Sequence, residues 1–368
     1  MTSISLVNAQ DSNLTSNDPP YYCPNKSGAF YQANLFPRYD IASKSLVLID
    51  DTNNQAVRTL DTFPENVRII NWSPDCRYLT GVVGDIESSF DYAKKKWIEI
   101  RWKNKDIVLW DASSGGRVQS FPNDGIYIDY LQPSPVEWSP DSNYALILGG
   151  CYSEFYSCLH ERVRSDFMWQ RSSNLRMRVG KTETLYYDRS WFNQYYWDMK
   201  RGWLWGSGEG GVSAYDVNTG VEVRFFQNNS WTESRFVFSA DNNKVVTYSV
   251  AQPGSGGNAA ITVYDIDSQA SVSVNVEGFA APDIALATYD SVALSADNHY
   301  LTAGYDAIRV WDIQNLPEKV EDRLPIYRYA GPKALIWSLR FSDAGVIETN
   351  SKEGIQHWDL HTGQFLAD

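Results

Sequence analysis

The sequence lacks any long run of apolar residues. A transmembrane helix needs about eighteen or more consecutive, mostly apolar residues, and no stretch of that length in these 368 residues is predominantly apolar. This absence excludes a helical membrane span.

Basic residues are also in short supply. The chain has 32 Lys and Arg against 45 Asp and Glu, which gives a formal net charge of -13. Neutralising the phosphates of a nucleic acid takes clustered Lys and Arg. The charge balance therefore argues against a nucleic-acid partner.

Histidines and recognised catalytic motifs are scarce. The chain has four His, and His160 and His299 are too isolated to suggest a metal pair. It contains no Gly-x-Ser-x-Gly, no His-Glu-x-x-His and no phosphate-binding glycine loop. Acidic pairs such as Asp85 with Glu87 have the chemistry of a glycosidase, but an acidic chain holds many such pairs in solvated loops. The sequence predicts no metal, no cofactor and no enzymatic activity.

Aromatic residues, by contrast, are abundant. They make up 14% of the chain, with 14 Trp and 23 Tyr, and they occur among frequent Gly, Asn and Ser. Aromatic residues favour strands, and the small polar residues favour turns. The composition predicts many short strands joined by tight turns.

Two short motifs recur along the chain. The first is an apolar stretch that ends in Asp and is followed by turn residues: LVLID (46–50), IVLWD (107–111), GVSAYD (211–216), ITVYD (261–265), IRVWD (308–312) and IQHWD (355–359). The second precedes it: YCPN (22–25), WSPD (72–75), WSPD (138–141), YWDM (196–199), FSAD (238–241), LSAD (294–297) and FSDA (341–344). Each pair indicates a tight turn and then a strand that ends in another turn.

The order of these motifs resembles the WD40 repeat, and the spacing between copies is that of a propeller blade. The resemblance covers residues 21–368 and implies one all-β, seven-bladed β-propeller; six or eight blades stay open. It also implies four antiparallel strands in each blade. The aromatic residue of each Trp-Asp pair would pack between blades, and its Asp would bind turn amides. Blade three matches least well, because its third strand must be NLRMRV (174–179).

The repeats depart from the family pattern in one respect. Members of the family carry a Gly-His pair before the first strand of a repeat, and none of the four His occupies that position. The hydrogen-bond network that this His forms in the family is expected to be absent. Stability would then depend more on aromatic packing.

Blades two and three carry long insertions between their second and third strands, at residues 85–105 and 151–173, and residues 250–260 form a shorter one in blade five. The first two are rich in aromatic and basic residues, the composition of binding hot spots. If adjacent blades raise them side by side, the candidate binding residues are Trp97, Trp102, Phe155, Tyr156, Arg162, Arg164 and Trp169. The alternative is two long hairpins without a binding role, and WIEIRW (97–102) alternates as such a strand would.

The first residues leave the compartment open. ISLVNAQDS (4–12) resembles the end of an export signal but lacks a charged start and most of an apolar segment. Residues 1–20 are therefore a polar tail or an export-signal remnant, and the protein is extracytoplasmic or cytoplasmic accordingly. In an exported protein Cys151 and Cys158 would pair within the second insertion, while Cys23 and Cys76 form a less favoured alternative; in the cytosol all four would stay reduced.

Two functions from different classes fit these observations. The first, which the sequence favours, is a non-enzymatic interaction module that binds a protein, peptide or glycan through the insertions. The second is an extracytoplasmic hydrolase or lyase that uses carboxylates around the centre of the propeller. The fold alone does not distinguish them.

Overall fold

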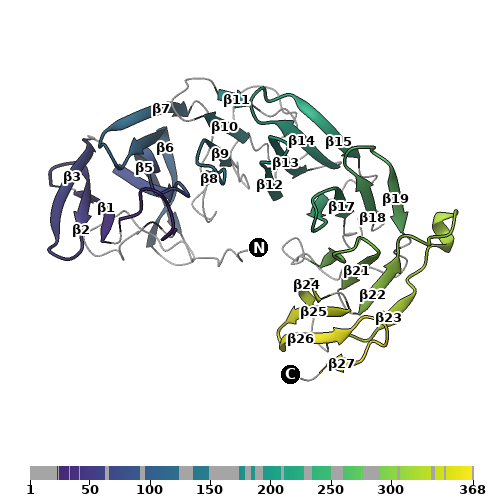
Figure 1. Ribbon diagram of the computed structural model, residues 1–368. Coiled ribbons are helices and arrows are strands. Elements are labelled where there is room, and N and C mark those ends of the chain that lie inside the picture. Colours follow the sequence, from purple (N-terminus) through teal and green to yellow (C-terminus); the bar gives the residue numbers. More distant parts are fainter. Residues whose placement is uncertain are drawn as a thin grey trace. The chain divides into compact units, whose positions relative to one another are not determined.

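The computed structural model is an all-β protein. It describes residues 23, 25–32, 34–40, 42–62, 66–91, 96–123, 136–148, 174–178, 184–186, 194–208, 211–227, 234–249, 260–274, 276, 291–304, 307–332, 336–343 and 345–366. These residues form seven antiparallel sheets, each built from strands that follow one another in the chain (Figure 1). This meander topology is that of propeller blades, and the sheets are called blades one to seven in chain order.

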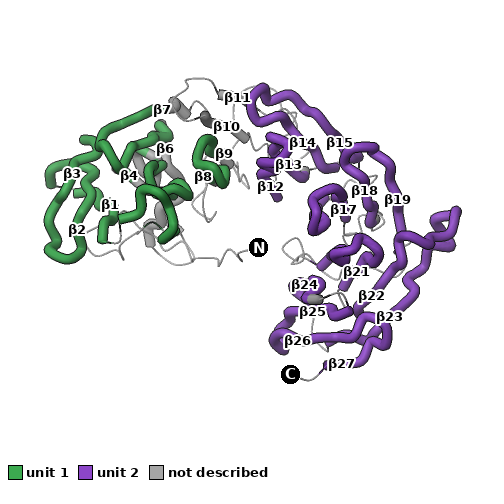
Figure 2. The backbone as a smooth tube through the Cα atoms, in the orientation of Figure 1, with its two compact units in different colours: residues 1–191 green, residues 192–368 purple. Residues whose placement is uncertain are grey.

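The chain divides into two compact units, residues 1–191 and 192–368 (Figure 2). The first unit contains blades one to three. Their strands are β1 (Leu35–Asp40), β2 (Ser45–Asp50) and β3 (Gln55–Thr62); β4 (Asn66–Trp72), β5 (Tyr78–Asp91), β6 (Lys96–Asp111) and β7 (Arg117–Asn123); and β8 (Val136–Trp138), β9 (Tyr144–Leu148), β10 (Asn174–Arg178) and β11 (Thr184–Tyr186). The segment NLRMR is the third strand of blade three, as the sequence predicts.

The second unit contains blades four to seven. Their strands are β12 (Gln194–Asp198), β13 (Trp203–Gly208), β14 (Gly211–Asp216) and β15 (Glu222–Gln227); β16 (Ser234–Phe238), β17 (Lys244–Ser249), β18 (Ala260–Asp265) and β19 (Ser271–Val274); β20 (Val292–Leu294), β21 (Tyr300–Gly304), β22 (Ile308–Asp312) and β23 (Tyr327–Tyr329); and β24 (Ile336–Asp343), β25 (Val346–Ser351), β26 (Gly354–Asp359) and β27 (Phe365–Leu366). The first strand of each later blade packs against the blade before it: β16 on β13 and β14, β20 on β16 and β17, and β24 on β20 and β21.

The hydrophobic core of each unit lies between consecutive blades. Trp110 of blade two packs with Leu46 and Leu48 of blade one, and Trp311 of blade six packs with the blade-five cluster around Val263. Both tryptophans are fully buried. A blade with two apolar faces cannot bury both alone, so neighbouring blades cover each other. The predicted role of the Trp-Asp aromatics, packing between blades, is confirmed for these pairs.

The turn between the first and second strands has the same hydrogen bonds in several blades. In blade five the Ser239 hydroxyl donates to Asp241 Oδ1 (2.6 Å), and Asp241 accepts the amide N–H of Asn243 (3.0 Å). The Lys244 amide donates back to Ser239 Oγ (2.9 Å), so this pair of side chains satisfies the turn. Ser73 with Asp75, Ser139 with Asp141 and Ser295 with Asp297 repeat the arrangement.

The residue after each of these turn aspartates adopts positive φ. We call it the joint position, because it contacts the turn of the preceding blade. Cys76, Ser142, Asn242 and Asn298 have φ values of 64°, 61°, 57° and 58°. Ser142 Oγ accepts the amide N–H of Asp75 (3.0 Å), and the Asn298 amide group donates to Asp241 Oδ2 (3.3 Å). Short polar residues tolerate this backbone conformation. The repeated turn therefore joins blades as well as strands.

Helix is nearly absent, as the sequence predicts. Among the residues that the structure describes, the one helical segment is the 3-10 turn η2 (Val320–Asp322). It lies between β22 and β23, outside the three insertions identified from sequence. In the same described ranges, no helix is long and apolar enough to cross a membrane.

Candidate functional site

The aspartates that end the third strands are engaged by the turns that follow them. Asp359 accepts the amide N–H groups of His361 (3.0 Å) and Thr362 (2.7 Å) and the Thr362 hydroxyl (2.8 Å). The hydroxyl bond, followed by the Thr362 amide bond, holds the pKa of Asp359 below its ordinary value. The same pattern occurs at Asp50, Asp111, Asp216, Asp265 and Asp312. These carboxylates are part of the scaffold, as the sequence predicts.

A basic side chain of the first turn also reaches the strand-end Asp in two blades. Arg77 Nη2 lies 3.1 Å from Asp111 Oδ2, and His299 Nε2 lies 3.1 Å from Asp312 Oδ1. Burial alone would raise the pKa of Asp312, but hydrogen bonds from Asn315 and Gln314, together with His299, outweigh it and lower the pKa. No His stands where the WD40 repeat carries its Gly-His pair. The contact of His299 with Asp312 is a different His–Asp pair.

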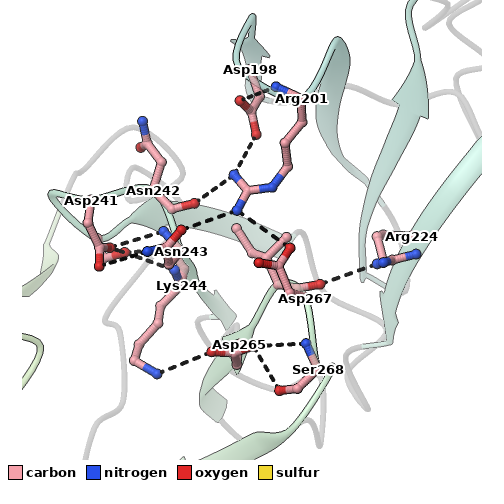
Figure 3. A network of polar contacts seen from close by, with 12 residues as sticks. Asp198, Arg201, Arg224, Asp241, Asn242, Asn243, Lys244, Asp265, Asp267 and Ser268 are labelled. Atoms are coloured by element: carbon pink, nitrogen blue, oxygen red, sulfur yellow. Dashed lines mark hydrogen bonds and ion pairs between the residues drawn. The ribbon is translucent and has the colours of Figure 1, made fainter.

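A larger polar network joins blades four and five (Figure 3). The Arg201 guanidinium lies 3.1 Å from Asp198 Oδ2, donates to the Asn242 carbonyl (2.8 Å), and lies 3.7 Å from Asp267 Oδ1. Asp198 is 2% exposed. The charge of this buried carboxylate is compensated by the guanidinium of Arg201, which is itself largely buried. A buried ion pair with several hydrogen bonds is costly to break. The paired donors and acceptors make this cluster a clamp between blades.

The first insertion extends β5 and β6 into a two-stranded arm, defined as residues 85–91 and 96–103. Gly84 is the last residue of β5 that pairs with β4, and Lys105 is the first residue of β6 that pairs with β7. Beyond them β5 and β6 continue to pair up to Asp91 and Lys96. The backbone of this insertion is thus a long hairpin, as the alternative predicts. Whether the hairpin binds a partner stays a prediction.

The strand register of the arm gives the positions of two predicted site residues. Trp97 is paired with Phe90, and Trp102 is paired with Ile86. Residues paired directly across antiparallel strands share a face. The register therefore brings each tryptophan position opposite an apolar or aromatic one.

The second insertion lies outside the described residues. Phe155, Tyr156, Arg162, Arg164 and Trp169 are all in it, as are Cys151 and Cys158. Residues 250–259 of the blade-five insertion are also outside the described residues. The proximity expected between Trp97 or Trp102 and this insertion, and the Cys151–Cys158 disulfide, remain predictions.

The disulfide that the structure describes joins Cys23 to Cys76, the pair that the sequence favours less. The two Cα atoms are 5.8 Å apart, and the residues are 53 positions apart in the chain. Cys23 occupies the place of the turn Ser in blade one, and Cys76 is the joint position of blade two. Both are buried. The repeats place both cysteines in the turns after the first strands of adjacent blades, but the sequence does not give the distance between those turns.

Contacts around the disulfide fix the segment at 23–31 against blade two. The Phe30 amide donates to the Asp75 carbonyl (2.9 Å), and the Asn25 side chain donates to the Pro74 carbonyl (2.5 Å). The guanidinium of Arg77 lies over the Phe30 ring, 5.3 Å from its centroid. Residues of both elements also line a small hollow beside the bond.

One further departure from the repeat was missed by the sequence analysis. The connection between the third and fourth strands spans five residues in blades two, four, five and seven, but residues 313–326 in blade six. The signal in the sequence is the distance from the Trp-Asp pair at 311–312 to the next strand.

A metal centre is not evident in the described part of the chain, where no group of three or more His, Cys, Asp or Glu is placed to hold an ion. The carboxylates around the centre of the propeller that the hydrolase alternative requires are untested. That alternative therefore stays a prediction.

Comparison with known proteins gives a likeness of fold alone. No protein-family model and no curated protein sequence matches the chain. Among solved structures, the β-propeller domain of Myceliophteria thermophila Cps50 (Swd1) is 12% identical over 89% of this chain and 92% of that chain, with a TM-score of 0.36. Kuenenia stuttgartiensis hydrazine synthase is 12% identical over 93% of this chain and 95% of that chain, with a TM-score of 0.38. Neither name nor activity carries over to this chain.

Proposed function

We propose that this WD40-like β-propeller is a non-enzymatic binding module that holds a protein, peptide or glycan on the β5–β6 arm. The observation that carries the proposal is the length of the arm. Its two strands pair with each other beyond the reach of β4 and β7. An isolated two-stranded ribbon is marginally stable in water, so an arm of this kind gains from a surface that packs against it.

The register divides the residues of the arm into two classes. Alternate residues of a strand belong to opposite faces, so Ile86 and Phe90 share one face of β5. The register shift between Glu87 and Ser88 pairs both Trp97 and Trp102 of β6 with that face, although the two tryptophans are five positions apart. The other face holds three pairs of opposite charge: Asp85 with Lys103, Glu87 with Arg101, and Asp91 with Lys96. Cross-strand pairs of opposite charge stabilise a ribbon. The charged face supports the arm itself, and the aromatic face is the one proposed for the partner.

The chemistry of the strand ends gives the strand-end aspartates a structural role rather than a catalytic one. The pKa values of Asp50, Asp265 and Asp359 lie below their ordinary value because hydroxyl and amide groups of the turns bind the carboxylates. A carboxylate held in its ionised form is a poor general acid. These aspartates are therefore unsuited to the protonation step that a glycoside hydrolase requires.

The proposal places the protein in an oxidising compartment. A buried disulfide that closes 53 residues is typical of secreted and periplasmic proteins and is rare in the cytosol. It supports the interpretation of residues 1–20 as the remnant of an export signal. An exported binding module would meet its partner outside the cytoplasm.

The experiment is a pull-down from an extract of the native source, together with a glycan array, using three proteins. The wild type and a Trp337→Ser control, which changes a tryptophan 41% exposed in blade seven, should retain the same partner. The Trp97→Ser/Trp102→Ser variant should lose it, because a buried aromatic anchor contributes about 2 kcal/mol or more. Circular dichroism checks that the variant is folded. A folded double variant that captures the wild-type partner would show that the arm is structural only.

A further inference from the structure

The connection between β22 and β23 stands out from its equivalents. It runs from residue 313 to 326, whereas residues 217–221, 266–270 and 360–364 make the same connection in blades four, five and seven. The short versions are tight turns governed by the strand-end Asp. Additional residues at one such place in a repeat form a feature that the scaffold does not require.

The base of this blade-six insertion (residues 313–326) is anchored in the core. Ile313 and Leu316 are partly buried against the hydrophobic cluster between blades five and six. The Ile313 amide donates to the His299 carbonyl (2.9 Å), and the Ile326 amide donates to the Val310 carbonyl (2.7 Å). Both ends of the insertion are therefore fixed to blade six.

Arg323 fixes the middle of the insertion. Its Nε donates to the Pro317 carbonyl (2.7 Å) and its Nη2 to the Glu318 carbonyl (2.7 Å), which close the segment on itself. Its Nη1 donates to the Ser273 carbonyl of β19 in blade five (2.9 Å). A guanidinium with several carbonyl acceptors orders the backbone before any ligand arrives, which lowers the entropy cost of binding.

This ordered segment exposes large aliphatic side chains. Val320, Leu324 and Ile326 are 45%, 55% and 48% exposed. From residue 323 to 326 half-buried and exposed residues alternate, so Leu324 and Ile326 share the outward side. Scattered exposed aliphatics are ordinary, but three within residues 320–326 of one ordered segment are a concentration of apolar surface of the kind that marks interaction sites.

The exposed charges of the segment are mainly negative. Glu318, Glu321 and Asp322 are exposed against Lys319 within the segment, and Arg328 of β23 is an exposed basic residue that follows on the side of Leu324 and Ile326. The donors of Arg323 point to carbonyl groups, as described above. A partner that buries the aliphatic side chains would bring its own rim residues close to these carboxylates, where complementary charge steers encounter and fixes register.

We propose that the blade-six insertion is a docking site for an extended, basic amphipathic segment of another protein, with aliphatic side chains set on Val320, Leu324 and Ile326. A second copy of this chain fits less well, because a two-fold contact would place the same acidic rim against itself. Anionic lipid surfaces would be repelled for the same reason. This site is independent of the β5–β6 arm.

The test uses a fluorescent peptide of alternating leucine and lysine, with two comparison peptides in which glutamate replaces lysine or serine replaces leucine. Fluorescence anisotropy with the full chain should show binding of the leucine–lysine peptide alone. Leu324→Ser/Ile326→Ser should weaken it by about tenfold or more. Val221→Ser, which changes a valine 60% exposed in the matching connection of blade four, should leave it unchanged.

A second variant replaces residues 313–326 with residues 217–221, the short connection of blade four. Circular dichroism should show a folded protein, and peptide binding should be lost. The Trp97→Ser/Trp102→Ser variant should bind the peptide as the wild type does, which separates this site from the proposed function. Wild-type affinity in the Leu324→Ser/Ile326→Ser variant, or equal binding of the glutamate peptide, would overturn the proposal.

Discussion

Breaking the Cys23–Cys76 bond should cost the first unit a large part of its stability. The substitution for this test is Cys23→Ser with Cys76→Ser, because serine occurs at both places in other blades. Ser73 occupies the turn position equivalent to Cys23, and Ser142 occupies the joint position with φ 61° where Cys76 has 64°. The backbone therefore accepts both changes, and the variant isolates the covalent bond.

The size of the effect follows from the loop that the bond closes. The cysteines are 53 positions apart. In the chain-entropy model, cross-linking a loop of this length removes unfolded-state entropy equivalent to about 4 kcal/mol at 25 °C. The surrounding contacts, which include the Phe30 amide bond to Asp75 and the Asn25 bond to Pro74, remain in both proteins. The difference in unfolding free energy should thus be close to the entropic value.

The assay is urea unfolding followed by far-UV circular dichroism, with the wild type measured oxidised and reduced. The reduced wild type and the double serine variant should coincide, and both should fall below the oxidised protein. Hydrogen exchange should locate the lost protection in β1 to β4, the strands between or next to the cysteines. Mass spectrometry of alkylated peptides separates this pair from Cys151 and Cys158. Superimposable curves for oxidised and reduced protein would refute the reasoning.

Two other properties follow from the described hydrogen bonds. Thr349→Val should lower the free energy of unfolding in urea by about 1 kcal/mol more than Thr302→Val does. Both buried hydroxyls donate to a carbonyl, but the Thr349 hydroxyl also accepts the indole N–H of Trp358 at 2.9 Å. Equal losses in the two variants would contradict this. Stability should be constant above the ordinary Asp pKa of 3.8 and fall below it, since the strand-end aspartates have lowered pKa values when folded and bind fewer protons than in the unfolded chain. The midpoint of thermal unfolding measured against pH checks it, and a change centred near the His range, about pH 6.5, would point to other groups.

The sequence predicts the blades well because the repeated motifs are local. IRVWD is β22 over the same five residues, and GVSAYD is β14. Each motif contains its own strand, its turn residue and its Asp, so a few neighbouring residues determine the structure. Even NLRMR, which lacks the Trp-Asp pair, was placed by counting from its neighbours and is the third strand of blade three.

The features that sequence reasoning missed or favoured less depend on contacts between blades. The Cys23–Cys76 bond joins two turns that are close only because consecutive blades pack together. The clamp at Arg201 likewise requires Asn242 and Asp267 from the next blade. Spacing along the chain gives neither the distance between the two cysteine turns nor the partners of Arg201. In the same way, WIEIRW alternates as a strand does, but its alternation leaves open whether the arm binds anything.

The joint position gives the blade array a direction. In each described joint one turn supplies its positive-φ residue and the preceding turn supplies a different group, such as the Asp75 amide for Ser142 or the Asp241 carboxylate for Asn298. The contact is head-to-tail, so it has no two-fold symmetry. A duplicated copy of blade five, inserted after the original, would present the same Asn242 and Asp241 to its neighbours and make every joint again. A blade without these groups in its turn would leave the joints on both of its sides unmade, so copying a blade preserves the joints better than inserting a different one.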